Sequence, residues 1–132
     1  MTKRTDRAPN AAELELIAEA AYRRIPERLR ALVDDVVIRI EEFPDDEVMD
    51  DMEIDDPYEL LGLYSGVSLD RKSVADVPQQ LDMIFLYRRP IIDYWAESGD
   101  SLEDVLRHVL IHEIGHHFGL SDEEMERLEK EA

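Results

Sequence analysis

Two histidines and a glutamate near the C-terminal end form the pattern in this sequence that is most specific for chemistry. The stretch His112-Glu-Ile-Gly-His116 places one imidazole four residues after another. On a helix, residues four apart lie one turn above each other, so both rings would project toward a common point, as a tetrahedral Zn²⁺ ion requires. Glu113 lies about 100° around the helix from His112, where it can accept a proton from a water molecule that the metal activates. The pattern therefore predicts a zinc site with Glu113 as general base.

The residues after the second histidine indicate a third ligand. Gly119 would end the helix, and the chain could then turn back and bring Asp122 to the metal. Asp122 also follows Ser121, a good N-cap, and the helix dipole alone favours an acidic side chain at that place. We expect Asp122 to be a ligand, with helix capping as the alternative explanation. A downstream Glu129 or Glu131 is a second candidate for third ligand, although the early helix end at Gly119 argues against it.

Two further histidines accompany this segment. His117 would point about 140° away from His112, so we expect it to pack or to lie at the surface. His108 lies on the same side as His112, one turn earlier. We expect it to be a partly buried structural histidine. The alternative is that it supports the metal ligands without binding the metal itself. The metal itself is inferred, since two histidines and one carboxylate also accept Fe²⁺, Mn²⁺ or Co²⁺.

The composition is that of a single globular domain. The chain has 132 residues, of which 44% are apolar, enough for one modest core. It has no cysteine, so any metal must be held by histidine and carboxylate groups. No stretch approaches the roughly 18 consecutive apolar residues of a membrane helix, and no apolar signal core follows the basic N-terminus. We expect one domain over residues 1–132, with residues 1–10 flexible, in the cytoplasm.

The charge is strongly and unevenly acidic. The formal net charge is −18, from 33 acidic and 15 basic residues. This argues against nucleic acid or an anionic membrane as a partner, because both require a positive surface. Between Asp34 and Glu59 there are 13 acidic residues and one basic residue, Arg39. We interpret this run as a solvated loop; a preference for cationic substrates is the alternative.

The N-terminal half should contain one helix and one strand. Apolar residues recur at three- and four-residue spacing from Asn10 to Leu32, which predicts a helix capped by Asn10 and interrupted by Pro26 near Ile25. The β-branched run Val36–Phe43 predicts a strand. Asp45–Asp56 should be an acidic loop.

The middle of the chain should contain the strongest strand. The segment 57–66, with Gly62 and Gly66, should be a short turn of helix or a strand. Gly66–Leu69 could be a short strand, followed by a polar connection over Asp70–Gln80. Leu81–Tyr87 has the clearest strand pattern.

Helices should dominate the C-terminal part. Ile91–Ala96 predicts a short helix, and Ser101 caps a longer one that runs to about Phe118. Ser121 and Glu124 form a capping box for a short final helix. The core contacts of the long helix should be Leu102, Val105, Leu106, Val109, Leu110, Ile114 and Phe118. A few strands among several helices, without regular alternation, predict an α+β domain with a small sheet.

The chain resembles the zincin metallopeptidases, and more narrowly a small bacterial family of metallopeptidases with a zincin-like, matrix-metalloprotease-like domain. His112–Asp122 is similar to the signature HExxHxxGxxD of that family, and the segments beginning at Glu59 (Glu-Leu-Leu-Gly-Leu-Tyr-Ser-Gly-Val) and Ile84 (Ile-Phe-Leu-Tyr-Arg-Arg-Pro-Ile) are similar to its other recurrent segments. The resemblance covers roughly Val36–Glu124. It implies a minimal zincin-like domain with a small mixed sheet, and one Zn²⁺ held by His112, His116 and Asp122, with Glu113 as base.

We therefore expect a zinc-dependent metallopeptidase, most simply an endopeptidase, that acts on a peptide or protein substrate. In zincins an edge strand above the site pairs with the extended substrate, and Leu81–Tyr87 is our candidate for that strand. One departure favours an alternative function. Metzincins have a methionine-containing turn well downstream of the third ligand, whereas Met125 follows Asp122 too closely. The alternative is a zinc-binding interaction or regulatory module with weak or no peptidase activity.

Overall fold

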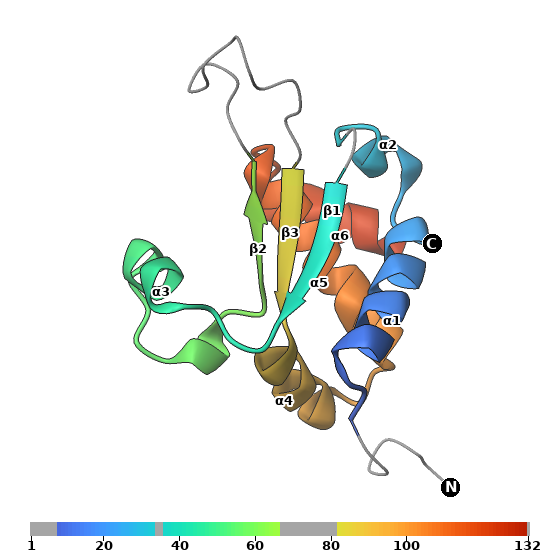
Figure 1. The fold of residues 1–132 in the computed structure, drawn as a ribbon. Coiled ribbons are helices and arrows are strands. Elements are labelled where there is room, and N and C mark those ends of the chain that lie inside the picture. The colour runs from blue at the N-terminus through green and yellow to red at the C-terminus, as the bar shows by residue number, and fades with distance from the viewer. Residues whose placement is uncertain (1–7, 34–35, 67–81, 132) are drawn as a thin grey trace, which may run out of the picture.

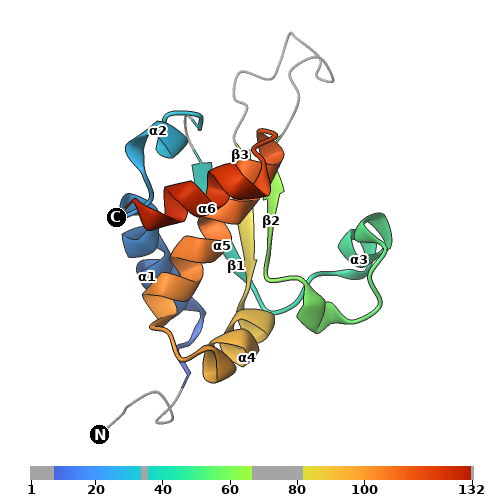
Figure 2. The ribbon, with the colours of Figure 1, turned by 180° about the vertical axis from the view of Figure 1, so that it is seen from behind.

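The computed structural model describes residues 8–33, 36–66 and 82–131, which form a three-stranded mixed sheet with helices on one face (Figure 1). The strand order is β1-β3-β2, with β1 (Val36–Glu41) parallel and β2 (Gly62–Ser65) antiparallel to β3 (Asp82–Tyr87). Helices α1 (Ala11–Arg23) and α5 (Leu102–His117) pack against each other and against the sheet, as the view from behind shows (Figure 2). The expected α+β domain with a small sheet is confirmed.

Pro26 divides the N-terminal helical segment, as predicted. Asn10 caps α1, and its side chain and backbone exchange hydrogen bonds with Glu13. The helix ends at Arg23, and α2 (Glu27–Arg30) follows Pro26, whose ring cannot continue the hydrogen-bond ladder of α1. Residues 1–7 of the segment expected to be flexible lie outside the described residues.

The acidic segment is partly helical, so the prediction of a loop over Asp45–Asp56 was wrong. Helix α3 (Asp46–Met52) lies within it. Asp45 caps this helix by accepting a hydrogen bond from the backbone of Val48, and the carboxylates of the first turn interact favourably with the helix dipole. No residue of α3 is buried. The sequence therefore lacks the apolar periodicity by which a packed helix is recognised.

A short 3₁₀ turn, η1 (Pro57–Glu59), leads into β2. The segment 57–66 thus contains both of the elements that the sequence allowed. A short strand was expected over Gly66–Leu69. Its first residue, Gly66, is not in a strand, because β2 ends one residue earlier. Residues 67–69 and the connection Asp70–Gln80 lie outside the described residues.

Strand β3 is the centre of the sheet. Its residues pair with β1 on one side and with β2 on the other. The strand predicted over Leu81–Tyr87 is therefore confirmed for Asp82–Tyr87, but its assignment as the substrate-pairing edge was wrong, since both of its edges are occupied. Helix α4 (Arg88–Ser98) begins directly after it and is longer than the predicted Ile91–Ala96.

The long C-terminal helix α5 begins and ends where the sequence indicated. Ser101 caps it, and Gly119 follows it with a φ of 79°, a left-handed conformation that glycine adopts without strain. Phe118 is 39% exposed, so its assignment to the core was wrong. The buried apolar residues of α5 are Leu102, Val105, Leu106, Val109, Leu110, Ile111 and Ile114. Helix α6 (Asp122–Lys130) packs on α5 by Met125 and Leu128.

Among residues 8–33, 36–66 and 82–131, no helix combines the length and the hydropathy that crossing a membrane requires.

Candidate metal centre

Glu113 lies beside the edge of β2 that pairs with no strand among the described residues. The carbonyl of Leu61 accepts a hydrogen bond from the backbone of Tyr87 on β3. Backbone groups of alternate residues in an antiparallel strand point to opposite sides, so those of Gly62 and Tyr64 point away from β3. The backbone of Tyr64 is hydrogen-bonded to the Glu113 carboxylate. The predicted base therefore lies next to the outer edge of β2, the one that faces away from β3.

The environment of Glu113 alters its acidity. Burial raises the pKa of its carboxyl group from 4.5 to about 7, and the hydrogen bond from the Tyr64 backbone lowers it by a smaller amount. Burial disfavours the charged form because the carboxylate loses its hydration. A carboxyl group with a pKa near neutrality can both accept and return a proton at neutral pH.

The two histidines of the predicted metal pair lie one turn apart on α5. The ring centroids of His112 and His116 are 5.8 Å apart, with an angle of 74° between the ring planes. The His112 side chain is 27% exposed, and His116 is exposed. The helical spacing thus places both rings on one side of the helix, as the sequence indicated.

Asp122 is the first residue of α6. The Ser121 side chain accepts a hydrogen bond from the backbone of Glu124, and the Glu124 carboxylate accepts one from the backbone of Ser121. The capping box is therefore confirmed. Asp122 is exposed and lies in the first turn, where a negative charge is favourable. Its role as a metal ligand stays a prediction, as does that of His116.

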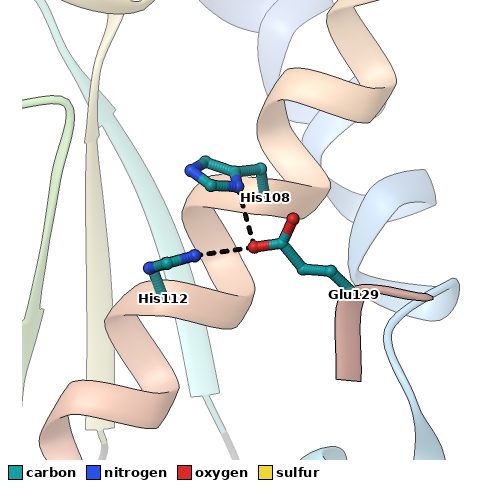
Figure 3. Close-up of side chains that lie close together, drawn as sticks. All are labelled: His108, His112 and Glu129. Atoms are coloured by element: carbon teal, nitrogen blue, oxygen red, sulfur yellow. Dashed lines mark hydrogen bonds and ion pairs between the residues drawn. The ribbon is translucent and has the colours of Figure 1, made fainter. Parts of the chain in front are cut away.

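A second group of potential ligands surrounds His112. In the part of the chain that the structure describes, one set of three side chains has ligand atoms within 4.8 Å of one another, namely His108, His112 and Glu129. Oε2 of Glu129 lies 2.6 Å from Nε2 of His112 and 2.8 Å from Nδ1 of His108. Figure 3 shows both rings turned toward this single oxygen. The structure thus joins His112 to two residues outside the predicted ligand set.

Arg107 fixes the part of α6 that carries Glu129. Its side chain is buried, at 7% relative exposure. Its guanidinium donates hydrogen bonds to the backbone carbonyls of Glu129, Glu131 and Arg24. The three carbonyls belong to the end of α6 and to the residue that follows α1, so one side chain of α5 holds both segments in place. Glu129 reaches His112 because its backbone is held at this position.

His117 faces the sheet and not the predicted metal ligands. Its ring stacks on that of Tyr64, with centroids 4.0 Å apart and an interplanar angle of 22°. The Tyr64 hydroxyl is 2.5 Å from Oδ2 of Asp82, and burial raises the pKa of this phenol. The expectation that His117 packs away from the metal is supported. Its contact holds the end of α5 against β2.

The donor atoms on α5 and α6 suit a zinc ion. Imidazole nitrogen and carboxylate oxygen are standard Zn²⁺ ligands, and both ligand sets that include His112 offer two imidazoles and one carboxylate. The two sets differ in the partners that would share an ion with His112.

The sequence indicated a place near the metal more clearly for His108 than for Glu129. His108 precedes His112 by the same four residues that separate His112 from His116, so its place on the ligand face could be recognised. Glu129 was an alternative ligand that the helix end at Gly119 had argued against. Glu129 comes close to His112 only because α6 folds back along α5, and no local sequence pattern predicts this packing.

A helix with the pattern His-Glu-x-x-His beside a small mixed sheet is the arrangement of the zincin class of metal-dependent hydrolases. Residues 33–132 match the family of zincin-like metallopeptidases. The chain therefore belongs to the zincin-like metallopeptidase family, and the resemblance seen in its sequence is confirmed. The match includes all of the sheet together with α5 and α6. The comparison with curated proteins gives no match.

Proposed function

We propose that this protein is a zinc-dependent peptidase with Glu113 as its general base. Membership of the zincin-like metallopeptidase family supports the reaction class. One observation of the structure carries the proposal further. The carboxylate that follows His112 in sequence is hydrogen-bonded to the backbone of Tyr64, on the outer edge of β2. A basic group thus lies beside a strand edge that no described strand pairs with.

His112, His116 and Asp122 would hold the zinc ion during hydrolysis. The two imidazoles come from adjacent turns of α5, and the carboxylate comes from the start of α6. When bound, zinc polarises the scissile carbonyl and a water molecule. Asp122 completes a set of two nitrogen ligands and one oxygen ligand, which leaves a fourth position for the reaction.

Glu113 would transfer the proton. Its carboxylate accepts a proton from the attacking water and passes it to the leaving amine. A pKa of about 7 suits both steps, because the group is then neither too weak a base nor too weak an acid near neutral pH. The Tyr64 backbone holds the carboxylate in place between the two transfers.

Strand β2 would bind the substrate. The backbone groups of Gly62 and the carbonyl of Tyr64 face away from β3, so an extended peptide would pair through them by β-augmentation, while the N–H of Tyr64 stays bonded to Glu113. Strand β2 takes the role that the sequence had assigned to Leu81–Tyr87. The peptide would then pass beside Glu113, which is bonded to the same strand.

The test is the variant Glu113→Gln, compared with Glu126→Gln on the exposed surface of α6. Zinc content is measured on each protein, and each is incubated with a mixed peptide library whose products are identified by mass spectrometry. We expect Glu113→Gln to retain zinc and to lose cleavage by at least about 100-fold, the lower end of what a general base supplies. Glu126→Gln should cleave like the wild type. Undiminished cleavage by Glu113→Gln would disprove the role of this residue.

A zinc-binding module without peptidase activity is the second candidate. The contact of Glu129 with Nε2 of His112 favours it, because the carboxylate occupies a nitrogen that the hydrolytic set requires. A wild-type protein that binds one zinc ion and cleaves no peptide of the library would establish this function and exclude the first.

A further inference from the structure

We propose that His108, His112 and Glu129 form a transition-metal site of their own, suited to Zn²⁺, which shares His112 with the hydrolytic ligand set. This site would hold an ion whether or not the protein hydrolyses peptides.

The donor atoms are close to the arrangement that zinc requires. Ligands at zinc distances of 2.0–2.2 Å lie about 3.3–3.6 Å apart around a tetrahedral ion. Oε2 of Glu129 is now 2.8 Å from Nδ1 of His108 and 2.6 Å from Nε2 of His112. The two ring centroids are 4.2 Å apart. Small rotations of three side chains, without backbone movement, would open the group around an ion.

The backbone that carries these ligands is already fixed. His108 and His112 are one turn apart on α5, whose apolar side chains form much of the core. Glu129 is held through its own carbonyl, which accepts a hydrogen bond from the buried Arg107. Little conformational entropy is therefore lost when the three side chains bind an ion, since only their own rotations remain free.

The site opens on a polar cavity. A cavity of about 210 Å³ is lined by His108 and Glu129 together with Tyr94, Asp100 and Asp104. The His108 side chain is 45% exposed, so an ion can reach the group from solvent. The cavity also has room for a water molecule as fourth ligand, since one water occupies about 30 Å³ in the liquid. This opening distinguishes the cluster from a closed ion pair.

Sharing His112 makes the two ligand sets mutually exclusive. Nε2 of His112 faces Glu129 in this structure, and the same imidazole belongs to the set with His116 and Asp122. One ion bound through His112 can therefore have His108 and Glu129 as partners, or His116 and Asp122. Variants that remove one pair of partners leave the other site intact.

The experiment uses the full chain after removal of metal with a chelator. The parent is the double variant His116→Gln/Asp122→Asn, in which both changed residues are exposed. Co²⁺ is titrated as a spectroscopic probe and Zn²⁺ by competition against it. We expect one bound ion per chain in this parent. Adding Glu129→Gln or His108→Gln should weaken binding by more than about 100-fold, because loss of an outer-shell partner alone costs about 10–100-fold.

Glu126→Gln, added to the same parent, is the matched control on α6 and should leave the affinity unchanged. Circular dichroism confirms that each variant is folded. A second measurement on the wild type uses ¹⁵N chemical shifts of the histidine rings, where Zn²⁺ should shift Nδ1 of His108 and Nε2 of His112. Absence of binding in the folded parent, or unchanged affinity after Glu129→Gln, would overturn the proposal. The cleavage assay on Glu113→Gln tests the peptidase function separately.

Discussion

The sulfur of Met125 occupies the space that a side chain at Gly115 would need. A Cβ atom built at Gly115 would collide with Sδ of Met125 and lie 2.7 Å from its Cγ. Met125 is completely buried, so its side chain has little room to move aside. The glycine between the two predicted metal-binding histidines thus allows α6 to lie against α5.

Gly115→Ala should therefore destabilise the protein by about 1–2 kcal/mol. Overpacking costs about 1–3 kcal/mol, and the higher helix propensity of alanine offsets up to about 1 kcal/mol of this. In a Met125→Ala background the collision is absent, and the same substitution should stabilise. Urea unfolding of the four proteins of this cycle measures both effects. An equal effect of Gly115→Ala in the two backgrounds would contradict the contact.

Arg107→Lys should loosen the end of α6. A lysine has one ammonium group and cannot reproduce three hydrogen bonds to carbonyls of different segments. Hydrogen bonds to a charged group are worth about 1.5–3 kcal/mol each, and we expect a total loss of roughly 2–3 kcal/mol because lysine retains part of them. Urea unfolding gives the loss, and hydrogen exchange should show faster exchange at the amides of α6. Arg127→Lys, at an exposed position of α6, is the control and should change stability by less than about 0.5 kcal/mol.

The metal-free protein should lose stability as the pH rises toward 7. Burial raises the pKa of Glu113 from 4.5 to about 7. The folded state therefore holds this proton more tightly than the unfolded state, and the stabilisation, complete at low pH, is lost as the pH rises through the folded pKa. Glu113→Gln should remove this part of the pH dependence, which amounts to at most about 3 kcal/mol. Urea unfolding in the presence of a chelator at pH 5, 6 and 7 measures it. Parallel pH profiles of the two proteins would refute the shift.

Variants of Ser121 and Asp122 should distinguish helix capping from metal binding. Ser121→Ala removes the side chain that accepts the hydrogen bond from Glu124, and it should cost about 1 kcal/mol of stability while peptide cleavage is retained. Asp122→Asn leaves that cap in place and should cost less than about 1 kcal/mol, but it should abolish cleavage if Asp122 is a zinc ligand. Unfolding and cleavage are measured on the same preparations. Full cleavage by Asp122→Asn would show that this residue only stabilises the helix.

Local patterns predicted the elements of the fold well. The caps at Asn10, Ser101 and Ser121 and the helix end at Gly119 were recognisable because each depends on a few neighbouring residues. Helix α3 was missed because it buries no side chain and so shows no apolar period.

These local patterns do not predict contacts between segments that are distant in the sequence. The position of β3 between β1 and β2 is set by pairing between distant segments, and a strand pattern alone does not distinguish a central strand from an edge strand. The contact of Glu129 with His112 likewise depends on the packing of α6, through Arg107 and Met125. The predicted pair His112 and His116 required only helical spacing, whereas the contact between Glu129 and His112 required the tertiary structure.

The parallel pairing of β1 with β3 also governs how the chain folds. Val36 lies opposite Asp82, and α1, at one end of the described chain, packs on α5, near the other end. Such contacts of high sequence separation must overcome a large loop-closure entropy before they stabilise anything, so they form slowly. During synthesis, α1 can pack on β1 but reaches its larger contact only after α5 has left the ribosome. The helix that carries the histidines is therefore also the segment that completes the packing of the N-terminal half.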